Sequence, residues 1–82
     1  MPAAVVDLRG LKCPLPALLA RRTLARAAPG EEIVILCDDP MAAIDVPHMC
    51  HEEGHDVLAV ERLEGSARLV LRRRGHSMPD VS

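Results

Sequence analysis

Cys13 is the residue whose type and neighbours best suit it to carry chemistry. It follows Lys12 and precedes Pro14 and Pro16 in a Cys-Pro-x-Pro run, where a helix is expected to begin. The positive end of a helix dipole favours a thiolate at such a position. Both prolines fit a first helical turn, whose amides have no partner within the helix. Because Lys12 and Arg9 add positive charge, we expect an exposed cysteine with a lowered pKa.

The surroundings of this cysteine favour sulfur exchange over acyl transfer. Acyl transfer needs a general base and an oxyanion site, and no His–Asp pairing is evident around Cys13. Attack of a thiolate on a sulfur–sulfur bond needs only access and a good leaving group. The alternative is that Cys13 is a small structural residue at the start of a helix.

The other two cysteines are expected to be packed apolar residues. Cys37 ends an apolar run, and Cys50 lies in an amphipathic segment. A resolving role for either thiol would require that it reach Cys13.

A histidine motif offers a different chemistry. Positions 51–55 read His-Glu-Glu-Gly-His, the spacing of a two-histidine zinc protease site. That site needs one continuous helix, whereas Gly54 stands where this helix is expected to end. We therefore expect solvated side chains and no metal; the alternative is a small metal site formed by His48, Cys50, His51 and His55.

Two adjacent carboxylates stand before the second helical segment. Asp38 and Asp39 precede Pro40, and a carboxylate followed by proline is typical of a helix N-terminus. Helix capping is the preferred explanation, with a functional acidic pair as the alternative.

Apolar periodicity and turn residues predict alternating strands and helices that position these groups. The expected elements are a strand that ends near Arg9 before Gly10, a helix over 15–28, a central strand over 32–37, a helix over 41–53 and two antiparallel strands, 56–64 and 67–73, joined by a hairpin turn at Gly65-Ser66. Pro47 is expected to kink or divide the second helix. This order predicts an α+β fold, a two-layer sandwich of a four-stranded mixed sheet with both helices on one face.

Length and composition restrict the classes of function. The 82 residues suffice for one domain, with a core over about 4–74 and a flexible tail over 75–82. Ten basic against twelve acidic residues, with no aromatic side chain, argue against direct nucleic-acid binding. No apolar run is long enough for a membrane span and no signal peptide is evident, while an odd number of cysteines favours a reducing compartment. We expect a cytoplasmic monomer.

The chain resembles the TusA/SirA/YhhP family of small sulfurtransferases from about Val5 to Arg74. The similarity lies in the run Asp7-Leu8-Arg9-Gly10-Leu11-Lys12-Cys13-Pro14-Leu15-Pro16, followed by Asp38-Asp39-Pro40, Asp45-Val46-Pro47 and Cys50. The resemblance implies a fold like the C-terminal domain of a bacterial translation initiation factor. It also implies that Cys13 carries a persulfide sulfur, supported by Arg9, Gly10, Lys12, Pro14 and Pro16, without a metal or an organic cofactor.

The resemblance further implies partners on both sides of the transfer. The donor would be a cysteine desulfurase or a rhodanese-type protein, and the acceptor a protein of the TusD/DsrE type. The destinations in the family include tRNA thiolation, molybdenum cofactor assembly and sulfur oxidation. Leu15, where several family members carry an acidic residue, and Leu19 are expected to dock partners beside the sulfur; alternatively they complete the edge of the core.

The sequence therefore predicts a sulfur carrier, a sulfurtransferase that accepts a persulfide sulfur on Cys13 and passes it to an acceptor cysteine. The alternative from another class is a regulatory or partner-binding module without enzymatic activity, in which Cys13 is structural. An RNA-binding module is a third interpretation and rests only on analogy of fold.

Overall fold

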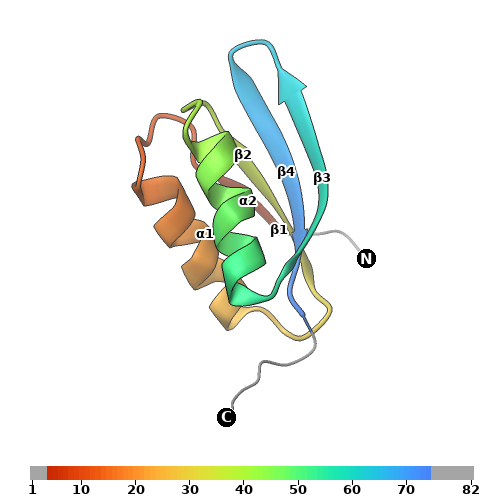
Figure 1. Ribbon diagram of the computed structural model, residues 1–82. Helices are drawn as coiled ribbons and strands as arrows, with labels where there is room; N and C mark the ends of the chain where they lie inside the picture. The colour runs from red at the N-terminus through yellow and green to blue at the C-terminus, as the bar shows by residue number, and fades with distance from the viewer. Residues whose placement is uncertain (1–3, 75–82) are drawn as a thin grey trace.

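The computed structural model describes residues 4–74, which form two layers (Figure 1). One layer is a four-stranded sheet, and the other consists of two helices that lie side by side over one face of it. The elements in chain order are β1 (Ala4–Asp7), α1 (Leu15–Arg26), β2 (Glu32–Cys37), α2 (Ala42–Glu53), β3 (Asp56–Leu63) and β4 (Ser66–Arg72). The expected α+β fold class and element order are confirmed.

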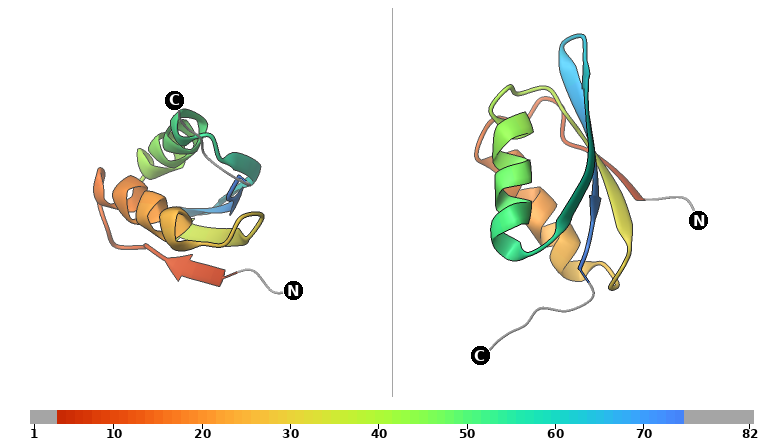
Figure 2. Two further views of the ribbon diagram at one scale, coloured as in Figure 1. Left: turned by 90° about the horizontal axis from the view of Figure 1, so that it is seen from below. Right: turned by 45° about the vertical axis from the view of Figure 1, so that its right-hand side comes forward.

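The sheet is mixed, with the strand order β1-β2-β4-β3. β1 and β2 are parallel neighbours, whereas β4 pairs antiparallel with β2 on one side and with β3 on the other. The views in Figure 2 show both helices on the same side of the twisted sheet. Because β1 and β2 are parallel, the loops that follow them leave from the same edge, which brings residues distant in sequence together.

The core lies between the two layers and is aliphatic. On the helix side of the sheet, Ile35 of β2 pairs with Leu69 of β4, and both are fully buried. Leu24 from α1 and Val46 from α2 cover this surface and are also fully buried. Within residues 4–74 no polar or charged side chain is buried, so apolar packing supplies the stability of the interior.

Several predicted boundaries differ from the structure. β1 ends at Asp7 rather than near Arg9. α1 ends at Arg26, two residues before the predicted Ala28, because Ala27 is extended and Arg73 donates to the carbonyl oxygens of Ala25 and Ala27. Capping of these free carbonyls by Arg73, the residue that follows β4, stops the helix early.

Two further predictions, one about α2 and one about the β3–β4 hairpin, also need correction. The predicted division of α2 at Pro47 is wrong, because the helix runs without interruption from Ala42 to Glu53. Proline removes one helical donor, and burial of the neighbouring Val46 against the sheet holds the helix together. In the hairpin, Leu63 pairs with Ser66, so the turn consists of Glu64 and Gly65 rather than Gly65 and Ser66.

Both helices are short, at 12 residues each. No helix among residues 4–74 is long and apolar enough to cross a membrane. The predicted tail over 75–82 lies outside the described residues.

The C-terminus of α2 depends on a glycine. Gly54 has φ 83° and ψ 20°, a left-handed conformation, and the next amide, that of His55, donates to Cys50 O at 2.8 Å. We expect Gly54→Ala to lower the free energy of unfolding by about 1 kcal/mol, because a β-carbon is disfavoured in this conformation. Gly54→Asn should lose less, since asparagine adopts it more readily. Urea unfolding of both variants measures the difference, and equal stability of Gly54→Ala and the unmodified protein would contradict this expectation.

Candidate functional site

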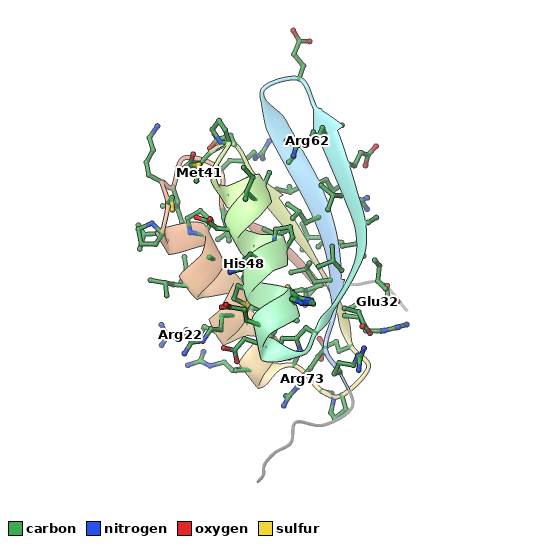
Figure 3. All side chains as sticks on the ribbon, in the orientation of Figure 1. Arg22, Glu32, Met41, His48, Arg62 and Arg73 are labelled. Atoms are coloured by element: carbon green, nitrogen blue, oxygen red, sulfur yellow. The ribbon has the colours of Figure 1, made fainter. Side chains whose placement is uncertain are left out.

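Cys13 lies in the loop between β1 and α1, at the edge of the sheet from which the β2–α2 loop also leaves. The amide of Leu8 donates to Leu36 O at 2.7 Å, which extends the pairing of β1 with β2 up to this loop. Both helices begin at this end of the molecule, and Met41 marks the start of α2 in Figure 3. The site is therefore formed where two strand ends and two helix beginnings meet.

Two aspartates hold the backbone of the Cys13 loop. The amide of Gly10 donates to Asp38 Oδ1 at 2.9 Å, and the amide of Cys13 donates to Asp39 Oδ2 at 2.6 Å. Asp39 Oδ1 also accepts from the amide of Met41 at 3.1 Å. The two amide hydrogen bonds, first that of Cys13 and then that of Met41, lower the pKa of Asp39. The carboxylate pair therefore ties the two loops together.

The preferred explanation of these aspartates as helix caps was incomplete. Met41, not an aspartate, occupies the N-cap position of α2, and no side chain caps that helix. Only the hydrogen bond that the Met41 amide donates to Asp39 is local, like the bonds of a helix cap. The remaining bonds reach 26 and 28 residues back along the chain, a distance that local pattern reasoning does not cover.

The thiol of Cys13 is exposed and bound to a carboxylate. Cys13 Sγ lies 2.7 Å from Oδ2 of Asp45, which stands in the first turn of α2. This hydrogen bond is the main cause that raises the pKa of Cys13, with smaller effects of desolvation and of the negative charges of Asp45 and Asp39. The sequence-based expectation of a lowered pKa is therefore wrong for the protein alone.

The two basic residues expected to act on the sulfur act on aspartates. Arg9 forms a bidentate pair with Asp7, with Nε at 2.8 Å and Nη2 at 2.7 Å from its carboxylate oxygens. This pair lowers the pKa of Asp7 to about 2. The charge of Lys12 acts on Asp39. Arg22 lies in the second half of α1, away from its beginning (Figure 3).

The prolines and the glycine of the motif shape the approach to α1. Pro14 occupies the N-cap position, and Pro16 lies in the first turn and is buried. Gly10 has φ 91°, which lets the chain turn so that its amide faces Asp38. The chain is thus anchored by a buried proline three residues after the exposed Cys13.

Cys37 and Cys50 are confirmed as packed residues. Both have no exposed surface and belong to the hydrophobic core. Burial raises the pKa of Cys50 to about 11 and is also the main cause that raises the pKa of Cys37. Neither is a nucleophilic thiol in the folded protein.

The histidine motif does not form a metal site. Gly54 ends α2 inside the motif, and His55 lies beyond the helix, where its Nδ1 accepts from the amide of Arg74 at 3.3 Å. His48 pairs with Glu52 at the surface. Among residues 4–74, no three side chains of the metal-binding types are grouped so that they hold an ion.

Asp45 is the site residue that reasoning from the sequence overlooked. In the sequence it belongs to the run Asp45-Val46-Pro47, which carries part of the family resemblance, and no role was assigned to it. The available signal was its place in the first turn of the second helix. That helix begins at the same sheet edge as α1, because β1 and β2 are parallel.

Comparison with known proteins decides the family. A family model described as "Sulfurtransferase TusA" matches residues 4–73, which is nearly the whole described chain. The chain belongs to the TusA sulfurtransferase family. Membership of this family supports a role as a sulfur carrier.

A solved structure shares the fold of this TusA-family protein. The crystal structure of a SirA-like protein from Desulfitobacterium hafniense superposes with a TM-score of 0.75, at 21% sequence identity. The match covers 87% of this chain and 97% of the other. The common fold is the two-layer arrangement of four strands and two helices described above.

Proposed function

We propose that this TusA-family protein carries sulfur as a persulfide on Cys13, accepting it from a donor protein and passing it to an acceptor cysteine. The observation that supports this most directly is the contrast between its three cysteines, all of which lie within residues 4–74. Cys13 is exposed in the loop between β1 and α1, whereas Cys37 and Cys50 are buried. Only Cys13 is accessible to a sulfur atom held by another protein.

The transfer requires only thiol and persulfide groups. Cys13 Sγ attacks the outer sulfur of a donor persulfide R–S–SH, a new S–S bond forms, and the S–S bond of the donor breaks. The donor sulfur leaves as a thiolate and takes up the proton that the Cys13 thiol gives up. Cys13–SH and R–S–SH thus become Cys13–S–SH and R–SH, with no net oxidation. The same step in the opposite direction delivers the sulfur to an acceptor thiol.

The surface beside Cys13 supports contact with other proteins. Leu15 and Leu18 of α1 are 47% and 50% exposed, and Met41 and Ile44 at the start of α2 are 49% and 56% exposed. Apolar side chains of this size at the surface are suited to a protein contact. Leu19, which was expected to dock partners with Leu15, packs against the core instead.

The family resemblance supports the choice of partners and pathway in this proposal. The donor is a cysteine desulfurase or rhodanese-type protein, and the acceptor is of the TusD/DsrE type. The protein acts in the cytoplasm as a monomer that meets each partner transiently, and it serves tRNA thiolation, molybdenum cofactor assembly or sulfur oxidation.

Intact-mass spectrometry after incubation with a cysteine desulfurase and cysteine tests the proposal. We expect a gain of one sulfur atom that a reducing agent removes, and peptide mapping should place it on Cys13. Cys37→Ala and Cys50→Ala are matched controls, and both should keep the full gain because neither thiol is exposed.

Two results would overturn this assignment. One is a protein that remains unmodified with desulfurase and rhodanese-type donors alike. The other is a sulfur atom that maps to Cys37 or Cys50 rather than to Cys13.

A further inference from the structure

Asp45 makes a contact that packing does not explain. Its carboxylate is partly exposed, and within residues 4–74 its side chain has Cys13 as its only hydrogen-bond partner. The contact joins two elements 32 residues apart, at 2.7 Å between Cys13 Sγ and Asp45 Oδ2. An ionised carboxylate only accepts hydrogen bonds, so the thiol must carry the proton for this contact to exist.

The other charged groups around the sulfur do not reverse this preference. Asp39 adds a second negative charge and holds the backbone amide of Cys13. Asp38 binds the loop at Gly10. Of the two nearby cations, Arg9 is paired with Asp7, and Lys12 acts on Asp39. The thiol therefore faces carboxylates from α2 and from the β2–α2 loop, without a cation bound to it.

We propose that Asp45 is a positioning residue that keeps the proton on the unloaded Cys13 thiol and turns the sulfur outward once Cys13 carries a persulfide. The inference rests on the proposed function of Cys13 as a sulfur carrier. It assigns to one carboxylate a different effect on each state of the carrier.

The effect on the loaded state follows from acidity. A persulfide is a stronger acid than the corresponding thiol, so Cys13–S–SH loses its proton at neutral pH and becomes an anion. An anionic sulfur has no proton to donate to Asp45, and the carboxylates of Asp45 and Asp39 repel it. Because Cys13 is exposed, the outer sulfur can turn into solvent, where an acceptor thiol reaches it.

The effect on the unloaded state is protection. A neutral thiol is a weak nucleophile and a poor target for oxidants. Sulfur therefore enters when a donor displaces the hydrogen bond to Asp45 and takes up the proton. The unloaded carrier resists unselective modification, and the loaded carrier presents its sulfur.

The pH dependence of alkylation at Cys13 tests this inference in both states. Unloaded protein is treated with iodoacetamide across a range of pH, and peptide mass spectrometry gives the rate at Cys13 alone. We expect Asp45→Asn to lower the pH midpoint by about 1 unit, since it removes the nearest negative charge. Asp45→Glu should restore part of the shift, and Glu52→Gln, which removes an exposed charge later on α2, should leave the midpoint unchanged.

The same variants are then loaded chemically with inorganic polysulfide and alkylated again. Because the persulfide has left Asp45, we expect the loaded profile of Asp45→Asn to coincide with that of the unmodified protein. Equal shifts in both states would show that the sulfur stays beside Asp45, and no shift in the unloaded state would show that Asp45 does not hold the proton. Either result overturns the inference.

Two features of the design keep the outcomes distinct. Circular dichroism verifies that the variants fold. If Asp45→Asn does not fold, Asp45→Ser serves as a second substitution. Neither arm uses a donor protein, so failure of enzymatic loading would contradict the proposed function while leaving the alkylation profiles to decide the role of Asp45.

Discussion

Replacing Cys13 by serine is expected to abolish sulfur transfer completely. A serine hydroxyl forms no persulfide, and the remaining cysteines are buried, so the variant has no site for the sulfur. The substitution is close to isosteric, the side chain is exposed, and the hydroxyl can still donate to Asp45. We therefore expect the stability to change by no more than about 0.5 kcal/mol. Delivery of isotopically labelled sulfur from a desulfurase to an acceptor protein measures the effect.

This experiment also separates the sulfur carrier from a regulatory binding module. A module in which Cys13 has only a structural role would keep its cellular activity in Cys13→Ser, because the loop amides still bind Asp38 and Asp39. Cys50→Ala removes a thiol elsewhere and should preserve transfer. Retained delivery of sulfur by Cys13→Ser would contradict the assignment of Cys13 as the carrier.

Leu69→Ala is expected to have the largest effect on stability. Leu69 is fully buried in β4, where it lies between Ile35 of β2 and Val60 of β3. Truncation of a leucine in a core costs about 2–5 kcal/mol through lost burial and the cavity left behind. A domain of this size has a total stability near the lower end of about 5–15 kcal/mol. We therefore expect a fall in Tm of at least about 8 °C.

Leu18→Ala is the matched control for this prediction. It deletes the same atoms from a side chain that is 50% exposed on α1, and alanine is a better helix former than leucine. We expect a change within about 1 kcal/mol, measured by thermal unfolding of both variants in the same buffer. Similar losses for the two substitutions would show that the core does not lie where the structure places it.

The fold was predictable because its signals are local. The apolar run Ile33-Val34-Ile35-Leu36 indicates a central strand, and β2 is indeed paired on both sides. Gly54 marks the end of α2, and Pro29 and Gly30 mark the turn between α1 and β2. The errors arose where tertiary contacts override local preference, as at Pro47, which packing keeps inside an uninterrupted helix.

The site was predictable only in part. The Cys-Pro-x-Pro run pointed to Cys13 itself, because this signal lies within four consecutive positions of the sequence. The shift in the pKa of Cys13 was predicted in the wrong direction, because Asp39 and Asp45 come from a second loop and a second helix. A helix dipole and adjacent basic residues can be seen in the local sequence, whereas a carboxylate 32 residues away is seen only in the folded chain.

The way the Cys13 loop is held has a consequence for how such a protein can change over evolution. Asp38 and Asp39 bind backbone amides, which every residue except proline provides. The shape of the loop is therefore insensitive to the identity of exposed side chains such as Lys12 and Leu15. These positions are free to diversify toward new partners, or to be redesigned for them, while the reactive sulfur keeps its place.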